Sequence, residues 1–452
     1  MATRFGTDGI RGTANAELTP ELVLALGRAT ARVLPADRFV VGRDTRRSGS
    51  MLQAALSAGI ASEGADVVDL GVLPTPGVAW VSAAQNVPAA VISASHNPFA
   101  DNGVKLFAPG GLKLPLEVEQ AIEKELEGLL DAPGHGPLPV TGHGVGRLRS
   151  DHEAAAGYLD HLLGSIEGRS LTGLRIMLDC ANGAASSVAP EAFGRAGAEV
   201  QAIGCEPDGA NINDGCGSTA PERLALELAA WGADLGLALD GDADRLVAVD
   251  HTGYVASGDE LLAIFARDMS SRGRLAGNTV VVTVMSNLGL RLALAELGVS
   301  VRETPVGDRN VLEALDAYGL ALGGEQSGHL VFRNLATTGD GILTGLLLAD
   351  LVARSGRSLR DLVEGAMQRV PQVLVNVEVP EPEMVLDDEM LQAELHSVEK
   401  ELGAGGRVLL RCSGTEPLVR VMVEASDETE ARIAAERLRD AVQAAASGGL
   451  LG

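Results

Sequence analysis

The sequence predicts an α/β protein of three related α/β domains followed by a smaller C-terminal α+β domain. One observation is a unit that recurs three times: an apolar strand, a polar or Gly-rich loop, an amphipathic helix and a second strand. Another is the different order in the last part of the chain, where two strands follow each other directly. The third is the length of 452 residues, because one hydrophobic core does not extend that far and several domains are expected.

The three copies of the repeated unit begin with the segments RFVVGRDT, LRIMLDCANG and NTVVVTVMSNLG. Their helices end near Gly64, Gly197 and Gly298, and their second strands are ADVVDLG, AEVQAIG and VSVRETPVG. Strands that alternate with helices in this way form βαβ units with parallel strands. We therefore expect a largely parallel sheet in each of the three domains.

The last part of the chain begins with the strand VLVNVEV and a helix whose apolar residues Leu391, Leu395 and Val398 recur at helical spacing. Two strands, RVLLRCSG and LVRVMVEA, and a final helix through Leu438 complete it. This β-α-β-β-α order predicts a small domain with an antiparallel sheet.

Polar breaks near residues 131–150, 251–258 and 366–372 are the expected domain boundaries, and the first, DAPGHGPLPVTGHGVG, is the clearest. The G-x-G elements there do not lead from a strand into a helix, so a dinucleotide fingerprint is rejected. The predicted domains are residues 1–150, 151–255, 256–368 and 369–452.

The net charge of −25, from 36 Lys and Arg against 61 Asp and Glu, argues against a general nucleic-acid or anionic-membrane surface. The N-terminal MATRFGTDGIRG lacks an apolar signal core, and the segment GILTGLLLADLVA from Gly341 is too short for a membrane span and predicts a buried helix. The cysteines are widely spaced without C-x-x-C, which favours neither zinc nor a disulfide framework and indicates a reducing cytoplasm. They are Cys180, Cys205, Cys216 and Cys412.

The segment LGLALDGDADR, residues 235–245, delivers three carboxylates from an apolar strand: Asp240, Asp242 and Asp244. Three carboxylates this close repel one another unless a cation joins them, and ligation by oxygen suits Mg²⁺. An EF-hand is excluded because Arg245 and His251 stand where that loop needs Gly and Glu. The simpler alternative, a solvated turn, fits three acids directly after LALD less well.

The segment VISASHNPFADNGVK, residues 91–105, places Ser95 at the end of an apolar strand, where ligands meet the chain in α/β proteins. Ser95 and His96 form no triad, because adjacent side chains are expected to diverge, and no G-x-S-x-G motif surrounds them. Taken alone, Ser95 is better explained as a loop hydroxyl and His96 as part of a turn. The residues Asp101–Gly103 predict a tight hairpin that brings Lys105 back, either as an exposed strand residue or as a cation near reacting oxygens.

The segment RCSGTEPLVR, residues 411–420, combines guanidinium groups, hydroxyls and backbone N–H groups, a composition that suits a phosphate dianion. A strand–turn–strand with exposed arginines explains it nearly as well. Three further loops carry weaker signals: GGEQSGH for sugar hydroxyls, FGTDGIRG and VGDRN. The residues singled out in these four segments are Arg411, Ser413, Gly414, Thr415, Arg420, Glu325, Ser327, His329, Thr7, Arg11 and Arg309.

Through these segments the chain resembles the α-D-phosphohexomutase superfamily. The motifs that carry the resemblance run in order over nearly the whole chain: FGTDGIRG, VISASHNPFADNGVK, DCANGA, DGDADR, VGDR, GGEQSGH, TTGDG and RCSGTEPLVRVMVE. Cys412 departs from the pattern, since relatives more usually have Lys or Pro there, which affects only a minor contact.

The resemblance implies four domains around a central cleft and a phosphoserine at Ser95. Its phosphate and the three aspartates would hold one Mg²⁺ per active site, and Arg11, Lys105 and Arg245 would line the transfer site. Thr7 and Arg309 would bind substrate, Glu325 and Ser327 would hold sugar hydroxyls, and the RCSGTEPLVR loop would bind the phosphate that is not reacting. Lys105 and His329 are the candidates for moving the hydroxyl proton.

The implied reaction interconverts glucosamine 6-phosphate and glucosamine 1-phosphate. Glucosamine 1,6-bisphosphate or glucose 1,6-bisphosphate would be the intermediate or activator. Such an isomerase of amino-sugar metabolism supplies UDP-N-acetylglucosamine for peptidoglycan precursors. The implied partner is a small phosphosugar in the cytoplasm, with no nucleic acid and no membrane, and a homodimer is compatible with the resemblance.

Three other functions stay open at this point. Phosphoglucomutase or phosphomannomutase activity is the nearest, because only the sugar loop decides between the substrates. The pattern from Leu239 to Asp244 also fits a sugar phosphatase that uses Asp240 as its nucleophile. A sugar-phosphate sensor that kept the pocket without catalysis is the third.

Overall fold

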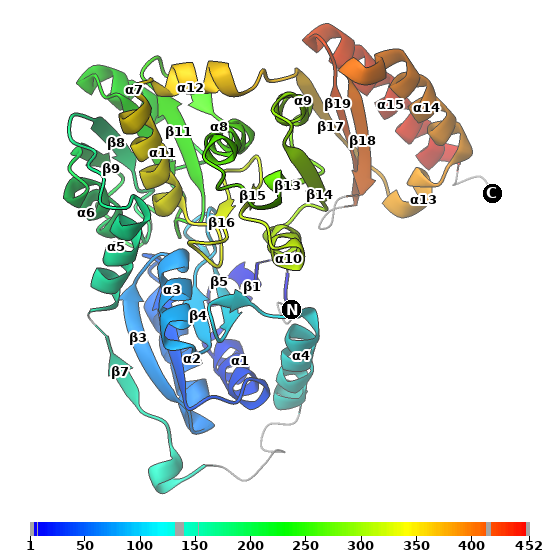
Figure 1. Cartoon of the computed structure of the whole chain (residues 1–452). Helices are drawn as coiled ribbons and strands as arrows, with labels where there is room; N and C mark the ends of the chain where they lie inside the picture. Colours follow the sequence, from blue (N-terminus) through cyan, green and yellow to red (C-terminus); the bar gives the residue numbers. More distant parts are fainter. Residues whose placement is uncertain (1–3, 7, 132–139, 152, 413–416, 449–452) are drawn as a thin grey trace. The chain divides into compact units, whose positions relative to one another are not determined.

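The computed structural model describes residues 4–6, 8–131, 140–151, 153–412 and 417–448 (Figure 1). The chain forms two compact units. The first comprises residues 1–283 and 302–365, and the second comprises residues 284–301 and 366–452. The division into four domain ranges stays a prediction.

The first sheet of unit 1 carries the Ser95 loop and has the strand order β1-β5-β4-β2-β3-β7, with β6 paired to β5. Strand β2 pairs in parallel with β3 and β4, whereas β5 runs antiparallel to β4 and β1. Its strands are β1 (Ile10–Thr13), β2 (Arg38–Arg43), β3 (Asp66–Val72), β4 (Ala89–Ile92), β5 (Asp101–Ala108), β6 (Leu112–Lys113) and β7 (Leu148–Ser150). The associated helices are α1 (Pro20–Val33), α2 (Gly49–Ser62), α3 (Thr75–Gln85) and α4 (Leu116–Asp131), and a 3-10 turn covers Gly142–Gly144.

Fully buried apolar residues explain why this first domain forms one core. The inward faces of β2 and β4 and of helices α1 and α2 contribute to a single cluster that includes Phe39, Val41, Leu26, Leu56 and Ile92. Strand β4 is buried on both faces and is entirely apolar. Polar residues therefore follow only after the strand ends, and Ser95 is one of them.

The second sheet carries the three aspartates and has the order β12-β11-β10-β8-β9. Strand β8 pairs in parallel with β9 and β10, and β11 returns antiparallel beside β10. Its strands are β8 (Arg175–Asp179), β9 (Glu199–Ile203), β10 (Leu235–Leu239), β11 (Leu246–Asp250) and β12 (Val255–Ala256). Its helices are α5 (Ala154–Ser165), α6 (Val188–Arg195) and α7 (Glu222–Trp231).

The third sheet has the order β14-β13-β15-β16, with β15 parallel to β13 and antiparallel to β16. Its strands are β13 (Thr279–Thr283), β14 (Ser300–Thr304), β15 (Leu322–Gly324) and β16 (Leu330–Phe332). The helices of this part are α8 (Gly258–Ser271), α10 (Asp308–Tyr318), α11 (Gly341–Ser355) and α12 (Leu359–Ala366), with a 3-10 turn at Ala276–Asn278. Helix α11 is mostly buried, as its apolar sequence predicts, and it packs on β10, β11 and α5.

Unit 2 contains the antiparallel sheet β17-β19-β18 with two long helices, together with helix α9 (Leu288–Glu296). Glu424 on β19 is fully buried and accepts hydrogen bonds from Asn287 at the start of α9 and from Arg407 on β18. The elements are β17 (Gln372–Glu378), α13 (Pro382–Leu386), α14 (Glu389–Leu402), a 3-10 turn at Gly403–Gly405, β18 (Arg407–Cys412), β19 (Leu418–Glu424) and α15 (Glu428–Gly448).

The predicted fold class is confirmed: the βαβ units have parallel strands and the last part has an antiparallel sheet. The tight hairpin predicted at Asp101–Gly103 is wrong, because these residues already belong to β5 and pair with β1. The reversal is a wider loop, residues 93–100, whose carbonyls are held by a buried arginine described below. None of the helices in the described ranges has the length and apolarity that a membrane span needs.

Candidate active site

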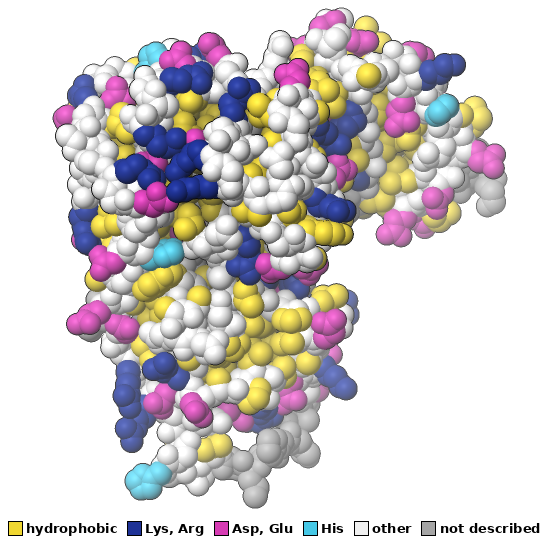
Figure 2. All heavy atoms as spheres, viewed as in Figure 1, with side chains coloured by type: hydrophobic (Ala, Val, Ile, Leu, Met, Phe, Trp, Pro, Cys, Tyr) yellow, Lys and Arg dark blue, Asp and Glu magenta, His cyan; other side chains and the backbone are white. Residues whose placement is uncertain are grey.

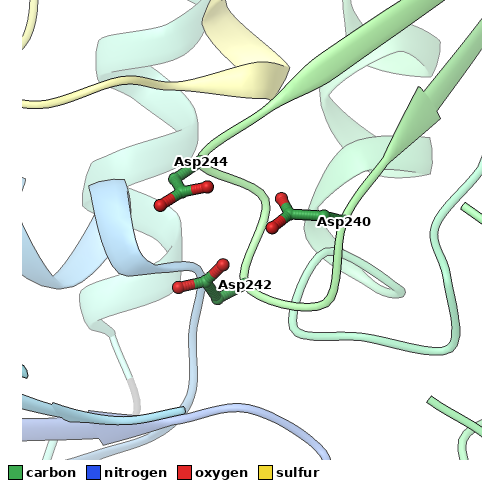
Figure 3. A group of neighbouring side chains, drawn as sticks. All are labelled: Asp240, Asp242 and Asp244. Carbon is green, nitrogen blue, oxygen red and sulfur yellow. The ribbon is translucent and has the colours of Figure 1, made fainter. Parts of the chain in front are cut away.

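The loop between β10 and β11 places three aspartates together (Figure 3). Strand β10 is buried along its whole length, and the chain reverses into β11 after six residues, so alternate side chains of the loop point to one spot. Asp240, Asp242 and Asp244 each offer a carboxylate oxygen, and these oxygens lie within 4.8 Å of one another. All three residues are at most 5% exposed.

The electrostatics of this cluster fit a cation. Burial, followed by the charges of Asp244 and Asp242, raises the pKa of Asp240 well above its ordinary value. Among the described residues, Asp242 Oδ1 and Asp244 Oδ1 are buried and have no hydrogen-bond partner. Buried carboxylate oxygens without partners are costly, and a hard cation with oxygen ligands would satisfy them. The residues present therefore fit Mg²⁺.

Ser95 faces this cluster from the loop after β4. Its side chain is fully buried, and its Oγ donates a hydrogen bond of 2.5 Å to Asp240 Oδ2. The backbone of Ser95 has φ +52°, a left-handed conformation that is rare for a residue with a side chain. Such strain concentrates at functional sites, where surrounding contacts hold it in place. His96 does not diverge as expected, since its Nδ1 lies 3.3 Å from Ser95 Oγ.

Arg46 holds the Ser95 loop in this conformation. This guanidinium is 2% exposed and donates to the carbonyls of Ser95 and Asn97 at 2.8 Å each. It also donates to the carbonyls of Pro98 and Asp101. Its Nε donates to Asp44 Oδ2 at 2.9 Å, so all three guanidinium nitrogens donate hydrogen bonds.

The Ser95 loop and the aspartate loop also contact each other through the backbone. Asn213 Nδ2 donates to the Ser95 carbonyl at 2.9 Å. A Cβ at Gly241 would lie 2.6 Å from the same carbonyl oxygen, so only glycine permits this approach. On the other side, Thr75 Oγ1 donates to Asp242 Oδ2 at 2.7 Å. These contacts fix Ser95 relative to the aspartates.

Lys105 lies on β5 with its ammonium among carboxylates. Its Nζ is 2.8 Å from Asp242 Oδ2, 2.8 Å from Asp8 Oδ2 and 3.4 Å from Asp244 Oδ2. Burial alone would lower the pKa of Lys105, but these three acids raise it well above its ordinary value. The exposed-strand alternative for Lys105 is excluded, because the residue is only 4% exposed.

Asp8 joins the site through two cations. Burial raises the pKa of its carboxyl, but Lys105 and Arg11 lower it to about 2. Arg11 pairs with Asp8 and donates to Asn97 Oδ1 at 3.2 Å, next to the Ser95 loop. Arg245 directly follows the aspartates, and its backbone N–H donates to Asp240 Oδ1 at 3.2 Å. Both predicted arginines therefore lie beside the cluster.

The turn between β15 and β16 carries the predicted sugar loop. Glu325 Oε1 accepts the N–H of Gly307 at 3.0 Å. Ser327 Oγ is buried and has no hydrogen-bond partner among the described residues. An unpaired buried hydroxyl is unfavourable unless a ligand completes it. Gly258 N–H donates to the carbonyl of Gln326 in the same turn, which ties the loop to α8.

His329 lies behind this loop and against the aspartates. Its Nδ1 is 3.8 Å from Asp244 Oδ2, and its Nε2 accepts the N–H of Gly339 at 3.2 Å. Burial lowers and Asp244 raises the pKa of His329, with a net rise. The hydrogen bond from Gly339, however, requires an unprotonated Nε2, so it favours a neutral ring with its proton on Nδ1.

Arg309 uses its guanidinium in contacts within the protein. Its guanidinium donates to the carbonyl of Leu114 at 2.8 Å and to Glu119 Oε1 at 2.5 Å. The structure thus uses this side chain in a contact between α10 and the start of α4. Thr7 lies outside the described residues.

In unit 2, Arg411 on β18 and Arg420 on β19 stand directly opposite each other in the antiparallel register. Like charges in this position destabilise a sheet. Burial, then the charge of Arg420, lowers the pKa of Arg411. An anion between the two guanidinium groups would remove the repulsion. Ser413, Gly414 and Thr415 lie outside the described residues.

Sequence reasoning missed several polar residues of this site: Asp8, Asp44, Arg46, Thr75 and Asn213. One signal could have identified the segment that carries Arg46, although not Arg46 itself. The segment DTRRSG follows β2, and β2 is the parallel neighbour of β4, so the end of β2 lies at the same sheet edge as Ser95.

Comparisons with known protein families match most of the chain. Four domain families match: Phosphoglucomutase/phosphomannomutase alpha/beta/alpha domain I at residues 2–131, domain II at 156–253 and domain III at 257–370, and the C-terminal domain at 374–441. The third of these ranges includes the turn of Glu325, and the second includes the three aspartates.

Individual proteins show the same similarity. The chain is 53% identical to a phosphoglucosamine mutase of Streptomyces coelicolor, over 98% of this chain and 100% of the relative. A phosphoglucomutase/phosphomannomutase family protein from Burkholderia thailandensis superposes with a TM-score of 0.84 at 26% identity, covering 98% of each chain. Aspergillus fumigatus N-acetylphosphoglucosamine mutase in complex with GlcNAc-6P and magnesium shares the fold, with a TM-score of 0.69 at 19% identity over 98% of this chain and 96% of that one.

Proposed function

The chain belongs to the phosphoglucomutase/phosphomannomutase family, and we propose that Ser95 carries the phosphoryl group in its phosphoglucosamine mutase reaction. This isomerase reaction interconverts glucosamine 6-phosphate and glucosamine 1-phosphate. The single observation that carries the proposal for Ser95 is its buried hydroxyl, 2.5 Å from Asp240 at the edge of a cluster of three carboxylates.

In the forward direction, the free hydroxyl oxygen at C1 of glucosamine 6-phosphate attacks the phosphorus on Ser95. The bond from phosphorus to Ser95 Oγ breaks as the bond to the sugar oxygen forms, and as the sugar hydroxyl loses its proton the departing Ser95 Oγ gains one. The resulting 1,6-bisphosphate turns around, and Ser95 Oγ then takes the 6-phosphoryl group. Glucosamine 1-phosphate leaves, and the enzyme is again phosphorylated.

Asp240, Asp242, Asp244 and the phosphate on Ser95 would hold one Mg²⁺. When bound, such an ion neutralises charge on the phosphoryl oxygens. The protein supplies the rest of the positive charge from Lys105, Arg11 and Arg245, which lie beside the same cluster.

Lys105 and His329 are the candidates for moving the hydroxyl proton, but the acids around Lys105 raise its pKa and keep it an ammonium, so Lys105 stabilises charge on the transferred group and does not receive the proton. Lys105 Nζ contacts Asp242 and reaches toward Asp244, so it lies next to the group that is transferred. His329 Nε2 is occupied by the N–H of Gly339, and a Cβ on Gly339 would lie 2.6 Å from that nitrogen. His329 is better suited to positioning Asp244.

Two further groups of residues would bind the substrate. Glu325 has one oxygen on Gly307 N–H, and its other oxygen would pair with the 2-ammonium group of glucosamine. Ser327 would bind a sugar hydroxyl. Arg411 and Arg420, with Ser413, Gly414 and Thr415 of the same loop, would hold the phosphate that is not reacting. We place the reaction in the cytoplasm.

The proposal is tested by intact mass and by activity on four sugars. Wild-type protein should include a form heavier by one phosphate, and Ser95→Ala should lose both this form and turnover. Phosphates of glucosamine, N-acetylglucosamine, glucose and mannose are compared, and kcat/KM should be highest for glucosamine because only its ammonium pairs with Glu325. A hydroxylamine-sensitive adduct on Asp240 would instead support the aspartate-nucleophile phosphatase.

A further inference from the structure

A cavity lies in unit 1, and none of the three aspartates lines it. Its volume is about 340 Å³, within the range of small-molecule sites. It is bounded by α8, the C-terminal half of α11, the segment after α5 and the residues after β16. Figure 2 shows Lys and Arg side chains gathered with a few acidic ones on the surface between α8 and α11.

The floor of this cavity is apolar. Phe265 and Phe332 meet edge to face with ring centroids 4.8 Å apart, and both side chains are nearly buried. Met269, Leu347 and Leu351 complete the apolar wall. Such a surface binds the hydrophobic body of a ligand, and aromatic rings in particular pack well against phenylalanine edges.

The rim is charged, with four arginines against three carboxylates. The arginines are Arg169, Arg272, Arg274 and Arg354, and the acids are Glu167, Asp268 and Asp350. One positive charge is therefore in excess, in a chain whose net charge is −25. A locally positive rim on an acidic protein favours an anion over a neutral or cationic ligand.

Two of these arginines keep donors for a ligand. Arg169 uses Nε, Nη1 and Nη2 on Asp350 and Glu167. Arg272, in contrast, contacts Asp268 only through Nη1, and Arg274 contacts Glu167 only through its two Nη atoms. These contacts leave guanidinium N–H groups of Arg272 and Arg274 for an anion at the rim.

The helices that wall the cavity start at the active site. Helix α8 begins at Gly258, whose N–H donates to the carbonyl of Gln326 in the sugar loop at 3.0 Å. Helix α11 begins at Gly341, whose N–H donates to the carbonyl of Ala243 in the aspartate loop at 2.9 Å. A ligand that spreads or draws together the far ends of α8 and α11 would therefore move both loops.

We propose that this cavity binds a small amphipathic anion and that its occupancy changes mutase activity through α8 and α11. The ligand has an aromatic or compact aliphatic body against Phe265 and Phe332, and a carboxylate, phosphate or sulfonate on Arg272 and Arg274. The effect on activity rests on the proposed function, whereas binding does not.

Binding is tested with the fluorescent probe 8-anilinonaphthalene-1-sulfonate on the full-length protein. We expect saturable binding of one probe per chain. The double variant R272Q/R274Q should weaken probe affinity by at least about tenfold, since charge-assisted hydrogen bonds are removed. Leu347→Trp, which fills the cavity from α11, should also weaken it. Arg195→Gln is the matched control, because Arg195 pairs with Asp160 on an exposed surface outside the cavity.

Thermal unfolding midpoints of all variants are compared first, since unfolded protein also binds this probe. Unchanged probe affinity in folded R272Q/R274Q, or equal weakening in R195Q, would overturn the proposed site. Mutase kcat/KM is then measured with and without saturating probe. A change in wild type that disappears in R272Q/R274Q supports coupling, and an unchanged kcat/KM at saturation refutes the coupling while leaving the binding result and the mutase assignment intact.

Discussion

Replacing Arg46 by lysine tests whether a buried guanidinium positions the phosphoryl-carrying serine. Arg46 donates to the carbonyls of Ser95, Asn97, Pro98 and Asp101 and to the carboxylate of Asp44. Lysine keeps the charge but has three donors on one atom, whereas the arginine fork has five. At least two of the five acceptors must lose their partner.

Two lost hydrogen bonds of this charge-assisted kind correspond to about 3 to 6 kcal/mol. Part of this loss lowers the free energy of unfolding. The rest lets the strained Ser95 backbone leave its reactive conformation in the folded protein, which lowers kcat. We expect unfolding to become easier by about 2 kcal/mol and kcat to fall roughly 100-fold, which is about 2.7 kcal/mol in the barrier.

The assay combines urea unfolding with steady-state mutase kinetics of Arg46→Lys at saturating substrate. Arg47→Lys is the matched control, because Arg47 is the exposed neighbour and its backbone N–H, which the substitution keeps, contacts Gly209. Wild-type kcat in a folded Arg46→Lys variant, or an equal loss in Arg47→Lys, would refute the positioning role.

Three further outcomes are expected. Asp242→Asn removes one charged ligand oxygen and should raise the Mg²⁺ concentration for half-maximal activity at least about tenfold, with the fold intact by circular dichroism; unchanged Mg²⁺ dependence contradicts the site. Burial raises the pKa of Asp340 to about 6 from the ordinary value of 3.8. The protonated carboxyl therefore stabilises the fold below about pH 4, and this contribution to the free energy of unfolding is lost as the pH rises through 6. Asp340→Asn should therefore flatten the fall in unfolding free energy between pH 5 and 7.5 by on the order of 1 kcal/mol, and a parallel profile would contradict this. Arg420→Ala should lower kcat/KM roughly 10- to 150-fold in both directions and release more bisphosphate, measured by phosphorus NMR. Wild-type kinetics in this variant would mean that other residues hold the phosphate that is not reacting.

The elements that the sequence predicts best are those with local signals. Strand β10 is a continuous apolar run, so its end and the following aspartates are visible without a structure. The same holds for Ser95 after β4 and for the three βαβ units. These features depend on residues close together in the chain.

Contacts between distant segments could not be predicted. Three arginines occur at positions 43, 46 and 47, and nothing in the sequence says that only Arg46 turns inward to the Ser95 loop. The contact of Arg309 with Glu119, 190 residues away along the chain, could not be predicted from the sequence either. The reversal at residues 93–100 was misplaced because Asp101–Gly103 has hairpin composition, whereas its pairing with β1 decides its conformation.

The most direct test of the account follows a labelled phosphoryl group on Ser95. The enzyme is labelled with ³²P, the position is verified by Ser95→Ala, and a single turnover is started with unlabelled glucosamine 6-phosphate. The label should leave the protein at a rate no slower than kcat and appear first in glucosamine 1,6-bisphosphate and then in glucosamine 1-phosphate. Label that stays on Ser95 during turnover, or that is carried by Asp240 and released by hydroxylamine, would contradict the central claim.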